Sequence, residues 1–291
     1  MNDAKVSPER RTFAASGNVT LVADAYGDRS APPVVLLHGG GQTRFAWGGT
    51  ASELARAGFY AVSVDQRGHG ESDWAADGDY ALTAFAADLG VVADALTLRT
   101  VKPAVIGASL GGMAAILAEG EREGGIASAI VLVDIGVTAQ KEGVARVLGF
   151  MQSGRDGFAS LDEVADAVAA YLPHRRRPKS IDGLAKNVRL RDGRYYWHWD
   201  PRFLEGRGHA DMERRLGAAA AKIRVPTLLV RGRLSDVIDE ADAREVKRVI
   251  PHSELVDVRD AGHMVAGDDN DAFTSAVTSF LARLRLSARL R

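Results

Sequence analysis

A serine stands between small residues in the run Gly107-Ala108-Ser109-Leu110-Gly111. An apolar stretch precedes this run, and a helical pattern that begins Gly112-Met113-Ala114 follows it. A sharp turn from strand to helix exposes the oxygen of its central serine and leaves room only for small flanking residues. The motif alone also arises by chance in a glycine-rich chain, so its place between a strand and a helix carries the inference. The run predicts that Ser109 is a nucleophile.

A nucleophilic serine needs a general base, and His263 is the best candidate among the seven histidines. It lies in the run Asp260-Ala261-Gly262-His263-Met264, just after the last predicted strand, where a loop can reach the carboxyl edge of a parallel sheet. His38 and His69 are the alternatives. Each sits in a glycine-rich turn, which favours a hydrogen-bonding role in the loop.

The acid that orients the base must come from another loop at the same edge. Asp236 follows the apolar run 228–230, and it gives the chain order Ser, Asp, His. Asp134 ends the apolar run 131–133 and is the main alternative, with Asp239 a weaker third. We expect Asp236 to hold the imidazole of His263.

Tandem glycines follow another apolar run, in His38-Gly39-Gly40-Gly41-Gln42. Glycine lets a backbone N–H approach a substrate oxygen closely, as an oxyanion hole requires. We expect the N–H of Gly40 to act with the N–H of Leu110, at the positive end of the helix after Ser109. The alternatives are a plain glycine-rich turn and a phosphate loop, but neither G-K-[ST] nor G-x-G-x-x-G follows here.

The elements that must position these residues alternate between strands and helices. Short apolar runs bounded by Gly, Pro and Asp predict strands, and longer stretches with helical spacing predict helices. Such alternation is typical of a mostly parallel sheet with helices on both faces. The predicted strands are 19–26, 34–37, 59–64, 104–106, 129–133, 227–230 and 254–258, and the main helices are 50–57, 81–96, 110–121, 240–249 and 272–284.

The alternation breaks between residues 136 and 221, where helical patterns such as 144–151 and 161–171 replace the buried strands. We interpret this part as a helical cap, with residues 1–135 and 222–291 forming the two parts of one α/β core. The basic cluster 174–179 is expected to be a solvated loop rather than an anion site.

Aromatic residues are densest at 195–201 within the predicted cap. Trp197, His198 and Trp199 are candidate substrate-binding residues, together with Gly41 and Met264. The alternative is that these aromatics join the cap to the core, since Trp and Tyr contribute large buried areas wherever they pack.

Composition excludes several classes of function. The 291 residues are 46% hydrophobic and 26% charged, as in a soluble globular protein, and no apolar run is long enough to cross a bilayer. A net charge of −1 favours neither nucleic acid nor an anionic membrane, so we expect a small-molecule partner. Cysteine is absent, which excludes thiol chemistry, and no metal-ligand motif occurs, so neither a metal nor a cofactor is expected. A cytoplasmic location is the default, and a homo-oligomer is compatible with the sequence.

Together these motifs resemble the α/β-hydrolase superfamily over residues 19–284. The run Asp65-Gln66-Arg67-Gly68-His69-Gly70-Glu71-Ser72 looks like the family's structural D-x-R-G-x-G-x-S turn, and Asp236 and His263 match its acid and base positions. The resemblance implies an eight-stranded, mostly parallel sheet with a helical cap inserted after strand six. Epoxide hydrolases and haloalkane dehalogenases of this fold use an aspartate nucleophile, so Ser109 argues against both.

A Ser, His, Asp set with two oxyanion donors suits acyl transfer. We expect hydrolysis of a carboxylic ester or lactone of a small, largely apolar substrate. C–C bond hydrolysis and cofactor-free perhydrolysis or haloperoxidation with the same triad are alternatives, and a non-catalytic ligand-binding relative is a third.

Overall fold

A computed structural model describes residues 7–98, 100–173, 181–205, 209–263, 265 and 270–289. The basic cluster 174–179 and Met264 lie outside the described residues. No helix in the described ranges is long and apolar enough to cross a membrane.

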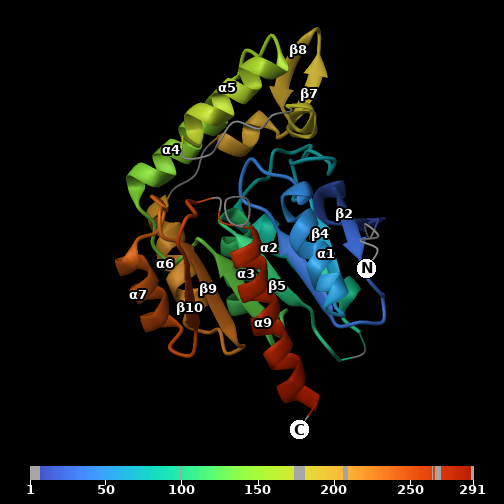
Figure 1. Cartoon of the computed structure of the whole chain (residues 1–291), viewed down its shortest axis with the longest axis vertical. Helices are drawn as coiled ribbons and strands as arrows, with labels where there is room; N and C mark the ends of the chain where they lie inside the picture. Colours follow the sequence, from blue (N-terminus) through green and yellow to red (C-terminus); the bar gives the residue numbers. More distant parts are fainter. Residues whose placement is uncertain are drawn as a thin grey trace.

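An eight-stranded sheet forms the centre of the molecule (Figure 1). β2 runs antiparallel to both of its neighbours, and the other adjacent strands pair in parallel, as the resemblance implied. In spatial order the strands are β1 (Glu9–Ala14), β2 (Thr20–Tyr26), β4 (Tyr60–Val64), β3 (Pro33–Leu37), β5 (Ala104–Ala108), β6 (Ala129–Val133), β9 (Thr227–Gly232) and β10 (Glu254–Val258).

Helices cover both faces of this sheet because its central strands are apolar on both sides. In β3, for example, Val35 and Leu37 belong to one core cluster and Val34 and Leu36 to the other, which is the two-residue alternation of a strand. The second cluster is closed by α1 (Gly48–Arg56) and α9 (Asn270–Arg289). The first is closed by α2 (Leu82–Leu96), α3 (Leu110–Glu121), α6 (His209–Ala220) and α7 (Glu240–Val249).

The segment between β6 and α6 forms a cap at one end of the molecule (Figure 1). It holds α4 (Lys141–Gln152) and α5 (Leu161–Tyr171), as the helical pattern predicted, and also an antiparallel hairpin of β7 (Val188–Arg191) and β8 (Arg194–Trp197). Short 3-10 turns flank the hairpin at Asp182–Asn187 and Pro201–Leu204, and two more lie in the core at Ser16–Asn18 and Arg44–Trp47.

α6 packs on the core helix α3, although the expected cap extends to residue 221. Arg215 of α6 pairs with Glu121 of α3 at 2.7 Å, and Gly120 lies so close to the Ala219 backbone that a Cβ there would overlap it. We infer that α6 belongs to the core layer and that the cap ends near residue 205.

Candidate active site

Ser109 occupies the strained turn that its neighbours predicted. It joins β5 directly to α3, with φ 44° and ψ −111°, a conformation that non-glycine residues rarely adopt. Glycine is required on both sides of it: a Cβ at Gly107 would overlap the Gly111 carbonyl, and a Cβ at Gly111 would lie 2.6 Å from the carbonyl oxygen of Leu37. The serine therefore stands at the N-terminus of α3, where Leu110 begins the first turn and its N–H has no intrahelical acceptor.

The glycine run after β3 passes beside Ser109. A Cβ built on Gly39 would lie 3.4 Å from the Ser109 Cβ, so the loop backbone lies beside the strained turn at Ser109. The N–H of Gly39 is already used, because it donates to Oε1 of Gln42 at 2.8 Å. The next N–H along the loop, that of Gly40, is therefore the one we assign to an oxyanion, and Gln42 closes the loop around it.

His38 is a structural part of this loop. Its Nε2 accepts the Gln66 N–H at 3.0 Å, so its Nδ1 carries the proton and donates to the Gly39 carbonyl at 2.8 Å. Burial lowers the pKa of His38 to about 4, and the charge of Arg44 acts in the same direction. The ring is neutral at pH 7, and both of its nitrogens are hydrogen-bonded. His38 therefore agrees better with a structural role in the loop than with that of the general base.

His263 faces Asp134. The ring Nδ1 donates to Asp134 Oδ2 at 2.8 Å, and both side chains are nearly or fully buried. The same carboxylate accepts the N–H of Gly232 at 2.9 Å and the hydroxyl of Ser235. Donation from Nδ1 leaves Nε2 as the free acceptor of a neutral imidazole, which is the form a general base needs.

The expectation that Asp236 holds His263 is therefore corrected. Asp236 pairs instead with Arg146 of α4 at 2.7 Å, and its side chain is 31% exposed. β6 and β9 are parallel neighbours, so both aspartates lie near the same edge, and chain order does not reveal which carboxylate turns toward the base. Asp239, the third candidate, caps the N-terminus of α7.

One small pocket brings together most of the candidate residues. It has a volume of about 40 Å³ and is lined by Ser109, His263 and the loop residues Gly39, Gly40, Gly41 and Gln42. Val147 and Phe150 of α4, Tyr171 of α5 and Ala108 complete its wall. The cap therefore covers Ser109 with apolar and aromatic side chains from its two helices.

The cap aromatics expected to bind substrate lie behind this wall. Trp197, His198 and Trp199 are all buried and are not among the lining residues. Trp197 stacks on Trp199 with ring centres 5.0 Å apart and packs on Phe150 at 5.2 Å. His198 and Trp199 contact the core loops at Gly70 and Gly41, which agrees with the alternative interpretation, whereas Trp197 packs within the cap. Gly41 does line the pocket.

Sequence reasoning missed Gln42, Val147, Phe150 and Tyr171 as pocket residues. Val147 and Phe150 are three positions apart on α4 and so share a helix face, but nothing in their spacing tells whether that face meets the core or the catalytic residues. Gln42 follows three glycines directly, and its amide side chain was the available signal in that run.

Comparison with known proteins decides the family. The profile of the alpha/beta hydrolase fold family matches residues 32–269, which is most of the chain. The chain belongs to the α/β-hydrolase fold family.

Characterised relatives of this hydrolase span nearly its whole length. It is 31% identical over 266 residues to the esterase Rv0045c of Mycobacterium tuberculosis, covering 87% of this chain and 83% of the esterase. It is 27% identical over 268 residues to the sn-1-specific diacylglycerol lipase ABHD11 of Mus musculus, covering 88% of this chain and 83% of the lipase. The crystal structure of an α/β hydrolase from Novosphingobium aromaticivorans superposes with a TM-score of 0.79 at 26% identity, covering 96% of this chain and 99% of that one.

Proposed function

We propose that the protein is a serine hydrolase that cleaves a carboxylic ester or lactone of a small, largely apolar substrate. The observation that carries the proposal is the Asp134–His263 hydrogen bond at the wall of the pocket that also holds Ser109. The similarity to an esterase and a lipase supports an ester substrate.

In the proposed reaction Ser109 Oγ attacks the acyl carbon while its proton passes to Nε2 of His263. The resulting oxyanion accepts hydrogen bonds from the backbone N–H groups of Gly40 and Leu110. His263 then gives the proton to the departing alkoxide, leaving an acyl group on Ser109. Water attacks this acyl-enzyme, its proton passes through His263 to Ser109, and the acid leaves. Asp134 fixes the tautomer of His263 and stabilises the imidazolium that forms during both acylation and deacylation.

The pocket favours a short, uncharged acyl group. Val147, Phe150 and Tyr171 present apolar and aromatic surface, and none of the described residues that line the pocket is Lys or Arg. A charged carboxylate on the substrate would lose its hydration there without gaining an ionic partner from this lining.

Labelling with a phosphonate that reacts with activated serines tests the mechanism. We expect one adduct per chain, located on the peptide that contains Ser109. Ser109→Ala should cost several orders of magnitude in kcat and retain some catalysis from the oxyanion donors. A label on another residue, or near-normal turnover by Ser109→Ala, would refute the proposed nucleophile.

Substrate class is tested by esters and lactones of graded acyl length, followed by product analysis. Release of a carboxylic acid and an alcohol in equal amounts from an ester, or of one hydroxy acid from a lactone, supports the proposal. Cleavage of a C–C bond beside a ketone, or peracid formation with hydrogen peroxide, would assign the same triad to the alternative reactions. Phosphonate labelling of Ser109 with no turnover of any of these substrates would count against ester hydrolysis itself.

A further inference from the structure

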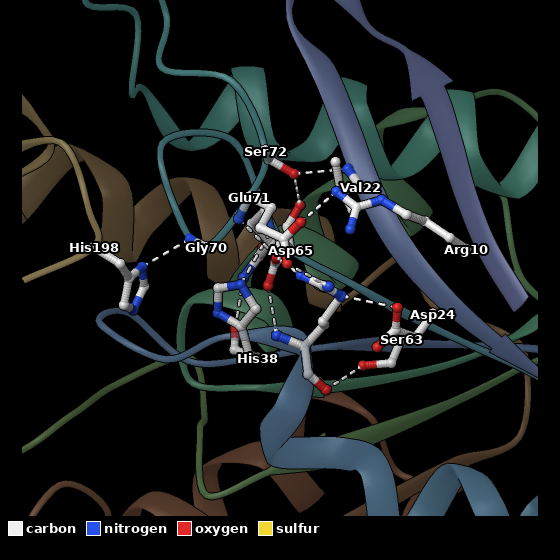
Figure 2. A network of polar contacts seen from close by, with 12 residues as sticks. Arg10, Val22, Asp24, His38, Ser63, Asp65, Gly70, Glu71, Ser72 and His198 are labelled. Carbon is white, nitrogen blue, oxygen red and sulfur yellow. Dashed lines mark hydrogen bonds and ion pairs between the residues drawn. The ribbon is translucent and has the colours of Figure 1, made fainter. Parts of the chain in front are cut away.

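Two cap residues hold Gly70, in the turn after β4, from both sides of its backbone. The Gly70 N–H donates to Nδ1 of His198 at 2.7 Å, and the Gly70 carbonyl accepts from Nη2 of Arg189 at 2.7 Å. Arg189 lies on β7 and His198 directly follows β8, so the two contacts come from one hairpin. Figure 2 shows the His198 ring directed at Gly70.

His198 is suited to this contact because it is neutral. Burial lowers its pKa well below the usual value, and the neighbouring His69 and His38 rings and Arg189 act in the same direction. Because Nδ1 of the neutral ring accepts the Gly70 N–H, the proton of His198 sits on Nε2, which is buried toward the backbone of Gly41 without completing a well-formed hydrogen bond.

The turn that contains Gly70 also holds the loop after β3, residues 38–44, which carries the proposed oxyanion donor Gly40. Asp65, at its start, accepts the Glu71 N–H at 2.9 Å and the Arg44 N–H at 2.6 Å. Arg44 closes the loop that begins at His38, and its guanidinium forms ion pairs with Asp65, Asp24 and Glu71.

The start of the loop is fixed to the same turn. Gln66 donates its N–H to the His38 ring and its side-chain amide to the His38 carbonyl at 2.5 Å. Both ends of the segment that carries Gly40 are therefore attached to residues 65–71. A Cβ at Gly70 would overlap the Asp65 carboxylate, so this turn can only pack as it does with glycine there, at φ +55°.

We propose that Arg189 and His198 are positioning residues for the oxyanion hole. By holding Gly70 they fix the turn 65–71, and this turn fixes the backbone that places the Gly40 N–H beside Ser109. The docked cap hairpin is in this way part of the machinery that stabilises the transition state. The inference rests on the proposed serine mechanism.

The test compares variants that remove one contact and keep the volume of the side chain. His198→Phe removes the acceptor for the Gly70 N–H, and Arg189→Met removes the donor to the Gly70 carbonyl. His198→Asn is the conservative variant, because its Oδ1 takes a place near that of Nδ1 and still accepts. Arg194→Met is the matched control: Arg194 lies on β8 and donates to the carbonyls of Asp156 and Gly157 within the cap, away from Gly70.

Each variant is titrated with the phosphonate, so that rates are expressed per reactive Ser109. kcat and KM are then measured for a small activated acetate ester well below the melting temperature. The Ki of a trifluoromethyl ketone, whose adduct on serine carries an oxyanion, is measured beside that of an uncharged ether analogue of the ester.

We expect His198→Phe and Arg189→Met to lower kcat by about tenfold to a hundredfold, somewhat less than the loss of a complete oxyanion donor. The affinity for the ketone should fall by the same factor, with KM and the affinity for the ether within about twofold. His198→Asn should recover most of the loss, and Arg194→Met should match the wild type.

Unchanged kcat per titrated site and unchanged ketone affinity in both variants, with a lowered melting temperature, would overturn the inference and leave only a structural role. In that case normal labelling of Ser109 in the wild type keeps the proposed function intact. If the wild-type label falls elsewhere, the proposed function fails and this inference fails with it.

Discussion

Hydrogen bonds from two residues besides His263 hold the carboxylate of Asp134 in place. Gly232 and Ser235, from the end of β9 and the turn after it, fix the two oxygens, so that Oδ2 meets His263 in a single orientation. Its backbone is constrained as well, because Asp134 has φ 47° and its N–H donates to the Val230 carbonyl at 2.8 Å. A carboxylate fixed in this way stabilises an imidazolium without having to reorganise.

Replacement of each aspartate by asparagine separates the two candidates for the acid. Asp134→Asn should lower kcat by about 10³ to 10⁴, because the amide favours the wrong tautomer of His263. Asp236→Asn should change kcat by less than about threefold, since a partly exposed ion pair with Arg146 that does not touch His263 contributes little. Steady-state kinetics on one activated ester measures both, and the opposite ranking would return the role to Asp236.

Local conformation can be predicted from the sequence where the neighbouring residues dictate it. The strained turn at Ser109 could be predicted because glycine is needed at 107 and 111, where the structure leaves no space for a Cβ. The choice between Asp134 and Asp236 depends on the direction of two side chains at the ends of adjacent strands. That direction is set by long-range donors such as Ser235, which no local pattern reveals.

At the scale of elements, the cap helices and the cap hairpin have separate tasks. α4 and α5 present Val147, Phe150 and Tyr171 to the pocket, where Phe150 stacks on Tyr171 with ring centres 4.3 Å apart. Trp197, at the end of β8, packs behind Phe150, and its indole N–H donates to the Ser153 carbonyl at 2.8 Å.

A bulky residue in the pocket wall should change which substrates are cleaved. Val147→Phe narrows the space above Ser109, so kcat/KM for a hexanoate ester should fall by tenfold or more relative to an acetate ester, in line with contacts that act on selectivity. Rates for an acyl series of two to eight carbons measure this. An equal change for every chain length would show that Val147 does not limit the acyl group.

Trp197 should instead contribute to stability. Trp197→Ala should lower the free energy of unfolding by about 3–5 kcal/mol, the usual cost of truncating a buried aromatic side chain. Urea unfolding followed by circular dichroism measures the loss. Below the transition the ranking of acyl chain lengths should stay as in the wild type, and a reordered ranking would place Trp197 in the specificity pocket after all.

Two elements were missed by sequence patterns for different reasons. β1 (Glu9–Ala14) is an edge strand whose side chains are mostly polar, so no apolar run announces it. The hairpin of β7 and β8 did carry a signal, the pair Asp192-Gly193, whose φ angles of 48° and 74° suit a tight two-residue turn. The helical patterns around it masked that signal, and with it the second layer of the cap.

The turn after β4 is also tied to α2 by a buried ion pair. Arg67 donates to both oxygens of Asp88 at 2.6 Å, and burial raises the pKa of Asp88. Arg67→Met should lower the free energy of unfolding by about 3–5 kcal/mol, because it leaves a buried carboxylate without its partner. The double variant Arg67→Met with Asp88→Leu should recover much of the loss, and an undiminished loss would show that other contacts of Arg67 dominate.

For the whole molecule, neutral buried histidines make the fold sensitive to acid. The pKa values of His38 and His198 lie below those of the unfolded chain, so the unfolded state binds protons first as the pH falls from about 6.5. Their contribution to stability is complete above that pH and is lost on the way down toward pH 4. Two such groups should lower the free energy of unfolding by about 3 kcal/mol between pH 6.5 and 5.

Urea unfolding at several pH values between 5 and 7 measures this slope. His198→Asn removes one of the two groups, so its stability, although lower in absolute terms, should fall with pH about half as steeply between pH 6.5 and 5. An identical slope in the wild type and His198→Asn would mean that His198 is not kept neutral by the fold.

The position of Asp134 ahead of the cap has a consequence for how such a protein can change over evolutionary time. The proposed nucleophile, oxyanion donors and acid are all encoded in one unbroken stretch, residues 38–134, and only the base follows the insertion. Residues 136–205 can therefore be exchanged as a cassette without shifting any of them along the chain. A cassette taken from another hydrolase would still need a cation and a neutral acceptor that meet at Gly70, and a graft lacking them would bind its new substrate and turn it over slowly.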